Sequence, residues 1–213
     1  CAEIMAYMPD ECVDLTVTSP PYDNLRTYKG YEFPFEDIAS QLYRITKQGG
    51  VVVWIVADAT IDGSETGTSF KQALYFKEVG FNLHDTMIWN KNSFSAVGAL
   101  KTRYAPVFEY MFVFSKGKIK TFNPIKDKEN KSYGIKPSGT LRQKDGTRRN
   151  RSSSKEVPKF SQRNNIWDLP PFRGKTEHPA PFPEQLANDH IISWSNEGDI
   201  VFDPMCGSGT TLK

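Results

Sequence analysis

The sequence is poor in the residues that build disulfide frameworks and metal sites. Its 213 residues include three histidines and three cysteines, Cys1, Cys12 and Cys206. Three cysteines cannot all pair, and their spacing matches neither a disulfide framework nor a zinc knuckle. We therefore predict a chain with no metal site, in a reducing compartment inside the cell, with the cytoplasm as its location.

Long apolar runs are also missing. The longest, Val51 to Ala57, is far shorter than the roughly 20 residues of a membrane-spanning helix, and the chain does not open on a basic leader with an apolar stretch. We predict a soluble protein with no membrane partner. A composition of 38% hydrophobic, 24% charged and 13% aromatic residues excludes disorder, collagen and coiled coil, and suffices for a sizeable core.

The net charge of +2 conceals an uneven distribution along the chain. From Lys116 to Asn165 there are 15 Lys and Arg against four Asp and Glu, whereas the rest of the chain has 12 against 21. A basic block joined to an acidic body is typical of an insert that binds a polyanion, because neutralised phosphates release counterions. A solvated loop has the same composition, so charge alone leaves both interpretations open.

Hydrophobic periodicity alternates between strand and helix. The spacing predicts strands over 13–18, 51–56, 81–89, 107–114 and 199–202, and helices over 3–8, 35–47, 68–79 and 183–194. In the helix 68–79, Phe70, Leu74 and Tyr75 form the apolar stripe. This order predicts an open α/β sheet with helices on both faces. Between Lys116 and Gln162 no helix or strand period is visible.

The first motif follows the strand 13–18 and reads Ser19-Pro20-Pro21-Tyr22. Ligands of open α/β sheets bind beyond the carboxyl ends of strands, where this rigid exit places a hydroxyl, a carbonyl and an aromatic face. A proline-rich strand exit without a role is the alternative. Asp58, at the end of the buried strand 51–56, either faces the same pocket or caps the next turn.

The second motif follows the strand 199–202 and comprises Asp203, Pro204, Met205, Cys206, Gly207, Ser208, Gly209, Thr210 and Thr211. A glycine-rich turn before a helix lets the backbone approach a ligand, and Asp203 adds a carboxylate. The lysine of a phosphate-binding loop and the third glycine of the dinucleotide fingerprint are both absent. The motif therefore favours a zwitterionic or cationic ligand over a phosphate, with a tight turn and helix cap as the alternative.

The two motifs together resemble the amino-methylating DNA methyltransferases that use S-adenosylmethionine, in the circularly permuted beta group whose target motif precedes the cofactor motif. Members carry Asp, Asn or Ser before Pro-Pro-Tyr. Their cofactor turn has the form Asp-Pro-Phe-x-Gly-Ser-Gly-Thr-Thr, in which Met205 here replaces Phe. The segments His178 to Pro183, Trp89-Asn90-Lys91 and Glu109-Tyr110 are similar to segments that members have at comparable places.

The resemblance covers nearly the whole chain outside Lys116 to Gln162, where the family places its variable target-recognition region. It implies an α/β fold with an open, mostly parallel sheet of the class I methyltransferase (Rossmann-like) type, in circularly permuted order with a basic variable insert. Residues 1–115 would form the catalytic half, 116–165 the insert and 166–213 the cofactor-binding half. Members continue into a further helix and strand, so we expect a truncated chain.

The resemblance also implies a mechanism. The Ser19 hydroxyl and the Pro20 carbonyl would accept the hydrogens of the target amino group, Pro21 would stiffen the exit, and Tyr22 would stack on the base. Residues 203–211 would bind S-adenosylmethionine, and the target nucleotide would be flipped out of the duplex. Ser before Pro-Pro-Tyr, together with Phe182-Pro183, resembles the subgroup that methylates cytosine N4, which favours that base over adenine N6.

Double-stranded DNA is the partner that the resemblance implies. Within the insert, the predicted DNA contacts are Arg142, Lys144, Arg148, Arg149 and Arg151. The sequence does not decide whether a restriction endonuclease accompanies this chain in a restriction-modification system. It does not decide the oligomeric state either. Two alternatives also remain: a non-catalytic nucleic-acid-binding module that keeps the fold, and a methyltransferase that acts on RNA or a small molecule.

Overall fold

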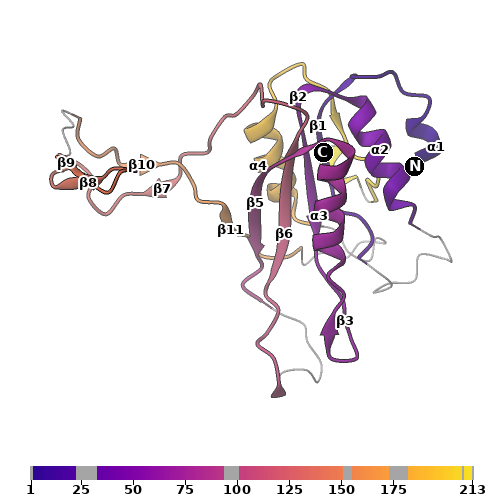
Figure 1. Cartoon of the computed structure of the whole chain (residues 1–213), viewed down its shortest axis with the longest axis horizontal. Coiled ribbons are helices and arrows are strands. Elements are labelled where there is room, and N and C mark those ends of the chain that lie inside the picture. The colour runs from indigo at the N-terminus through magenta and orange to yellow at the C-terminus, as the bar shows by residue number, and fades with distance from the viewer. Residues whose placement is uncertain are drawn as a thin grey trace. The chain divides into compact units, whose positions relative to one another are not determined.

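A mixed β-sheet is the frame of the protein (Figure 1). The computed structural model describes residues 2–22, 33–93, 101–150, 155–172, 182–207 and 209–212. The chain divides into two compact units, which we call unit 1 (residues 1–123 and 165–213) and unit 2 (residues 124–164). The sheet belongs to unit 1, and its six strands are β1 (Val13–Thr18), β2 (Thr46–Val56), β5 (Asn82–Asn90), β6 (Phe108–Ser115), β11 (Ile166–Asp168) and β12 (Val201–Phe202).

The order and direction of the strands determine which residues lie at each edge of the sheet. The order is β11-β5-β6-β2-β1-β12. The pairs β11–β5, β2–β1 and β1–β12 are parallel, whereas β6 is antiparallel to both of its neighbours. Five strands therefore end at one edge of the sheet, and β6 begins there. We call this the carboxyl edge.

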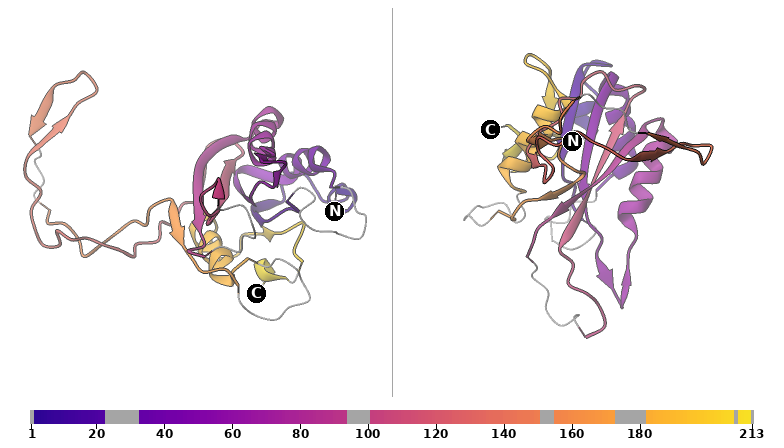
Figure 2. Two further views of the ribbon diagram at one scale, coloured as in Figure 1. Left: turned by 90° about the horizontal axis from the view of Figure 1, so that it is seen from below. Right: turned by 90° about the vertical axis from the view of Figure 1, so that its left-hand side faces the viewer.

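Helices cover both faces of the sheet, as Figure 2 shows. One face packs on α4 (Glu184–Trp194), through side chains such as Leu15, Val17 and Leu186. The other packs on α1 (Ala2–Met5), α2 (Phe35–Ile45) and α3 (Thr68–Val79), with Trp54 at its centre. Residues 49–56 of β2 are buried throughout, as expected of a strand covered on both faces.

The predicted α/β class is confirmed, and each predicted strand and helix of unit 1 overlaps an observed one, although β2 begins at Thr46 rather than at Val51 and β11 was not predicted. The predicted apolar stripe of α3 is confirmed for Tyr75, which packs against the core, and is wrong for Phe70 and Leu74. Phe70 and Leu74 are 49% and 58% exposed, whereas Gln72, Ala73 and Phe76 are buried. Gln72 faces the core because its Oε1 accepts a hydrogen bond of 2.8 Å from the indole Nε1 of the fully buried Trp54.

Short strands missing from the sequence prediction complete the chain. A hairpin of β3 (Thr60–Ile61) and β4 (Ser64–Glu65) follows β2. In unit 2, the segment predicted to lack regular structure contains two antiparallel pairs, β7 (Lys128–Glu129) with β10 (Phe160–Ser161) and β8 (Thr140–Arg142) with β9 (Arg148–Asn150). Runs of two or three residues are too short for a hydrophobic period to show.

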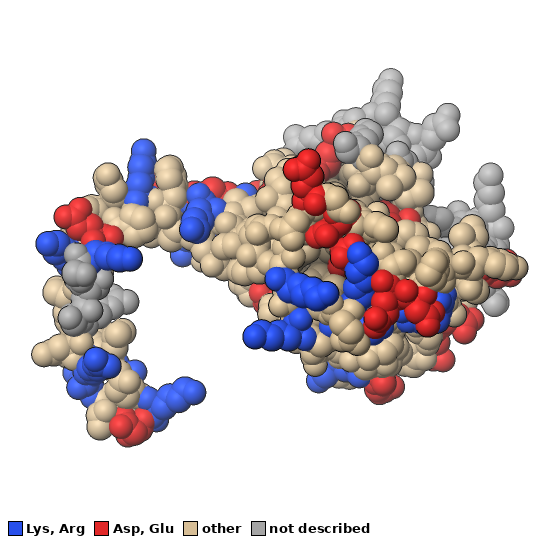
Figure 3. Space-filling model, turned by 90° about the horizontal axis from the view of Figure 1, so that it is seen from above, with Lys and Arg blue, Asp and Glu red and all other residues tan. Residues whose placement is uncertain are grey.

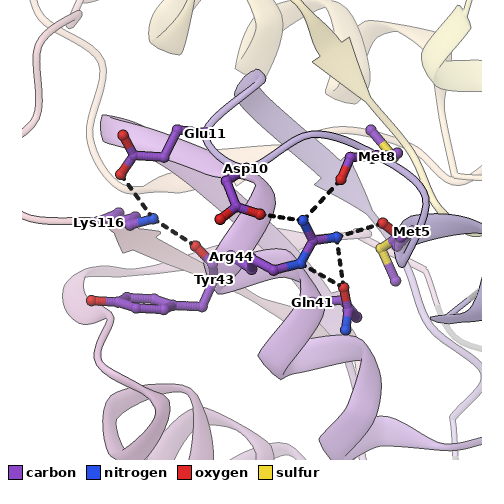
Figure 4. A network of polar contacts seen from close by, with 8 residues as sticks. All are labelled: Met5, Met8, Asp10, Glu11, Gln41, Tyr43, Arg44 and Lys116. Atoms are coloured by element: carbon purple, nitrogen blue, oxygen red, sulfur yellow. Dashed lines mark hydrogen bonds and ion pairs between the residues drawn. The ribbon is translucent and has the colours of Figure 1, made fainter.

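Arg44, near the end of α2, joins α2 to α1 (Figure 4). Its guanidinium donates to the main-chain oxygens of Met5 and Met8 at 2.7 and 2.8 Å, and to the side chains of Asp10 and Gln41. Met5 is the last residue of α1, and its carbonyl also accepts from the Met8 main-chain N–H at 2.9 Å. Arg44 therefore joins α2 to the end of α1 and to the turn that follows it. Among the described residues, no helix is long and apolar enough to cross a membrane.

We expect Arg44→Met to lower the free energy of unfolding by about 3 kcal/mol, because charged donors to two carbonyls are lost. Urea unfolding measures this change. The matched control is Lys47→Met, which removes a partly exposed ion pair with Asp14 and should cost less than about 1 kcal/mol. Equal losses for the two variants would contradict the role assigned to Arg44.

Candidate active site at the carboxyl edge

The two predicted motifs lie side by side at the carboxyl edge. Because β1 pairs in parallel with β12, the exit of β1 at Ser19 and the turn after β12 at Asp203 leave the sheet next to each other. A buried hydrogen bond of 2.6 Å from Thr18 Oγ1 to Asp203 Oδ1 joins the strand ends across 185 positions of sequence. The structure thus brings together the two segments that sequence analysis singled out.

Asp203 is a buried carboxylate that organises its own turn. Besides Thr18, it accepts hydrogen bonds from the Met205 main-chain N–H at 2.9 Å and from Thr211 Oγ1 at 2.8 Å. Burial raises the pKa of the Asp203 carboxyl, while the bonds from Thr18, Met205 and Thr211 oppose that rise. A carboxylate has about four acceptor positions, so the three donors among the residues that the structure describes leave one position.

The turn after Asp203 has a backbone that glycine makes possible. Gly207 and Gly209 have φ angles of 49° and 80°, in the left-handed region that glycine adopts without steric cost. An ideal Cβ at Gly209 would have no described atom within 4 Å. Met205 packs on the α2–α3 side of the core and Cys206 is exposed. The turn is therefore held by hydrogen bonds at Asp203, and its glycines leave space in which a ligand could approach the backbone.

Past the glycines, the predicted helix start appears as a single 3-10 turn over Thr210–Leu212. Thr211 is buried there, and Pro204 is half-buried. Ser208 lies outside the described residues, as do 173–181, which include most of the His178 to Pro183 segment.

A chain of hydrogen bonds runs from the first motif into the sheet. Ser19 Oγ lies 2.9 Å from Tyr22 Oη, and Tyr22 Oη donates to Glu109 Oε2 at 2.6 Å. The other oxygen, Glu109 Oε1, accepts from Lys91 Nζ at 2.9 Å. Pro20 is buried, and Ser19, Pro21 and Tyr22 are half-buried. Four polar side chains from three strand ends thus meet at one place.

Sequence reasoning missed the roles of Glu109 and Lys91, although both lie in segments similar to known family segments. The antiparallel direction of β6 explains their position. Since β6 begins at the carboxyl edge, Glu109 lies opposite Trp89, close to the point where β5 ends. One signal in the sequence could have predicted this ion pair. Glu109 is near the start of one predicted strand, and Lys91 comes shortly after the end of the strand before it.

Asp58 acts as a cap, which was one of its two predicted roles, but it caps the start of α3 rather than the turn that directly follows β2. Its Oδ1 accepts from the Ser69 main-chain N–H at 2.9 Å, and its Oδ2 accepts from Ser69 Oγ at 2.5 Å. It therefore caps the first turn of α3, as a carboxylate does at a helix N-terminus. Among the described residues, no cluster of His, Cys, Asp and Glu could hold a metal ion.

The predicted DNA contacts lie in unit 2, where Lys and Arg side chains outnumber Asp and Glu (Figure 3). Arg142 is on β8, Lys144 in the following turn, and Arg148 and Arg149 on β9, all exposed. Arg142 and Arg148 are direct cross-strand neighbours, an arrangement of like charges that weakens a hairpin unless an anion neutralises it. Arg151 lies outside the described residues.

Comparisons with known proteins identify the family to which this α/β sheet and its two motifs belong. The family model for N6/N4 DNA methylases matches residues 13–213. The orphan methyltransferase M.BamHII of Bacillus amyloliquefaciens is 57% identical over 213 residues, covering 96% of this chain and 80% of that protein. The chain belongs to the N6/N4 family of DNA methyltransferases.

Solved structures agree with the fold. The cytosine-N4-specific PvuII DNA methyltransferase matches with a TM-score of 0.69 at 20% identity, over 99% of this chain and 73% of that one. The DNA modification methylase TTHA0409 from Thermus thermophilus, solved in complex with S-adenosyl-L-methionine, matches with a TM-score of 0.61 at 25% identity, over 99% and 80% of the two chains.

The raised pKa of Asp203 gives stability a pH dependence of known sign. A raised carboxyl pKa means that this group stabilises the fold below its unfolded pKa of about 3.9, and that the contribution is lost as pH rises through the folded pKa. We expect the stability of Asp203→Asn, measured relative to wild type by urea unfolding, to increase from pH 4 to pH 7.

Asparagine keeps an oxygen for Thr18 and Met205 and can donate to Thr211 Oγ1, which also bonds the Val17 carbonyl. Asp145→Asn is the control, because hydrogen bonds from Thr147 lower the pKa of the Asp145 carboxyl. The stability of this variant relative to wild type should therefore decrease as the pH rises. A relative stability of Asp203→Asn that falls with pH would contradict the assignment.

Proposed function

We propose that this chain transfers a methyl group from S-adenosylmethionine to the exocyclic amino group of a base flipped out of double-stranded DNA. Family membership supports DNA amino-methylation as the reaction class. The observation that carries the proposal for this site is the hydrogen bond from Thr18 to Asp203, since it ties the Ser19–Tyr22 exit to the glycine-rich turn. A target-binding motif and a cofactor-binding motif must adjoin for direct transfer between their ligands.

The cofactor fits the second motif by its chemistry. A buried carboxylate with one acceptor position left, beside an open turn with glycines at positive φ, suits an amino group on a ligand that also carries positive charge. S-adenosylmethionine, when bound, supplies an electrophilic methyl group. In this proposal Asp203 fixes the turn and offers that position, and Pro204, Met205 and the residues up to Thr211 shape the wall.

The first motif holds the base. An exocyclic amino group is a poor nucleophile because its lone pair is delocalised into the ring. Ser19 Oγ and the Pro20 carbonyl accept its two hydrogens, which favours a pyramidal nitrogen whose lone pair points away from the ring. Tyr22 stacks on the base, and Pro21 keeps the exit rigid. Holding the reacting groups in contact can contribute about 7–11 kcal/mol to lowering the barrier.

Cytosine N4 is the preferred target in this proposal, and adenine N6 the other. Ser19, rather than Asp, precedes Pro-Pro-Tyr, and Phe182-Pro183 leads into α4, both features similar to cytosine-N4 enzymes. Either base offers an amino donor beside a ring acceptor, so Ser19 and Pro20 fit both.

Unit 2 supplies DNA affinity. It has 12 Lys and Arg against four Asp and Glu, and the predicted insert 116–165 contains it. Exposed cations on a two-stranded ribbon suit phosphate contacts, which dominate affinity for duplex DNA. Because the target motif precedes the cofactor motif in the chain, we assign a circularly permuted order to the halves 1–115 and 166–213. The relative M.BamHII is named an orphan methyltransferase, which favours action without a partner endonuclease.

The product identifies the reaction. After incubation with S-adenosylmethionine and mixed-sequence duplex DNA, mass spectrometry of the digested nucleosides should detect N4-methylcytosine. Ser19→Ala should lower the rate by about 10²–10³-fold, because one preorganised hydrogen bond to the reacting group is lost. N6-methyladenine would change the target base but keep the reaction. Methylation at an atom other than these two amino nitrogens, or none with demonstrated cofactor binding, would contradict the proposal.

The role of unit 2 is separable from the chemistry. We expect Arg148→Gln/Arg149→Gln to reduce the slope of log affinity against log salt by about 2, close to 0.9 for each lost phosphate contact. Fluorescence anisotropy with a labelled duplex measures the slope. Lys71→Gln/Lys77→Gln, which removes two exposed charges of α3, is the matched control. An equal change in both double variants would assign DNA binding to overall charge rather than to unit 2.

A further inference from the structure

Glu109 is a nearly buried carboxylate that no predicted role accounts for. Its side chain is 11% exposed and lies at the carboxyl edge, and each of its two oxygens has a different partner. Lys91, after β5, binds Oε1, and Tyr22, after β1, binds Oε2. A buried charge is costly unless it is paired, and Lys91 supplies the pairing cation. Both carboxylate oxygens are therefore held as acceptors.

The direction of each hydrogen bond in this chain follows from that charge. A carboxylate only accepts, so Tyr22 donates its single hydroxyl hydrogen to Glu109. Between Ser19 Oγ and Tyr22 Oη, at 2.9 Å, the hydrogen then has to come from Ser19. Among the described residues, no other group bonds to Ser19 Oγ. Its hydrogen is committed toward Tyr22, and its lone pairs remain to accept.

An acceptor is what the target amino group needs, because that group meets Ser19 with its hydrogens. We propose that Glu109, held by Lys91, is a positioning residue that fixes the Tyr22–Ser19 hydrogen-bond chain in the direction that makes Ser19 an acceptor. This inference rests on the proposed function of Ser19. Glu109 acts through Tyr22 and has no contact of its own with the base in this account.

A single substitution can reverse the direction of these hydrogen bonds without changing the size of the side chain. In Glu109→Gln the amide can present N–H groups to Tyr22 Oη. Tyr22 can then donate to Ser19, and Ser19 directs its own hydrogen at the amino group, where it meets hydrogens instead of a lone pair. We expect kcat for methyl transfer to fall about 10- to 100-fold, up to the cost of losing one preorganised hydrogen bond, with KM for S-adenosylmethionine and for DNA unchanged.

A double-mutant cycle separates positioning from simple structural support. Tyr22→Phe removes the link between Glu109 and Ser19, so Glu109→Gln should have little further effect on kcat in that background. Glu78→Gln, the same exchange at an exposed position of α3, should match wild type. If Glu109→Gln leaves kcat unchanged, or lowers it by the same factor with and without the Tyr22 hydroxyl, the inference is overturned. Absence of methyl transfer by wild type would instead refute the proposed function.

The direction of the Ser19–Tyr22–Glu109 hydrogen bonds can also be measured by NMR, which needs no enzymatic activity. The Tyr22 hydroxyl proton, bonded to a carboxylate at 2.6 Å, should give a downfield proton NMR resonance that is assigned by its loss in Tyr22→Phe. In Glu109→Gln that resonance should move upfield, whereas it should stay in place in Glu78→Gln. A Tyr22 resonance that is unaffected by Glu109→Gln would overturn the proposed direction even if the enzyme were inactive.

Discussion

The parallel pairing of β1 with β12 is the constraint on which the candidate site depends. It brings residues 185 positions apart to one edge, where Thr18 donates to Asp203 inside the core. Parallel neighbours end at the same edge, so the segments that follow them leave the sheet together. The exit at Ser19 and the turn at Gly207 are therefore neighbours because of the sheet, before any contact between their own side chains.

Two largely buried carboxylates at this edge, Asp203 and Glu109, differ in their hydrogen-bond partners and in their proposed roles. Asp203 has neutral donors, two threonine hydroxyls and one main-chain N–H, and burial raises the pKa of its carboxyl. Glu109 has a cationic partner, Lys91, and a phenol. In our account the first shapes a turn for a ligand with positive charge, and the second sets the hydrogen-bond direction of Ser19. The difference lies in the partners, since both side chains are largely removed from water.

Local sequence patterns predicted most of unit 1, because its elements are long enough to show a period. The strand over 13–18 and the helix over 68–79 have the predicted bounds. Phe70 and Leu74 were wrongly placed on the buried face of that helix, where Gln72 instead binds the indole N–H of Trp54, a residue of β2. The short strands of unit 2, such as β8, have no period to read. The first error comes from a tertiary contact that no local pattern contains, and the second from strands that are too short to show a pattern.

The same limit applies to the site. Ser19 and Asp203 were found because each sits in a motif, and their proximity follows from parallel strand order. Glu109 and Lys91 were not assigned roles, since their meeting with Tyr22 requires β6 to run against its neighbours and to start at the carboxyl edge. A residue whose function depends on three strand ends becomes visible only with the topology.

A crystal structure with S-adenosylhomocysteine and a duplex that contains the methylated site is the most direct test of the central claim, that the two motifs form one active site. The account predicts an extruded base whose amino nitrogen lies about 2.7–3.2 Å from Ser19 Oγ, with the cofactor product against the turn of residues 203–211. A base that stays stacked in the duplex, or an amino group bound away from Ser19 and Pro20, would contradict it.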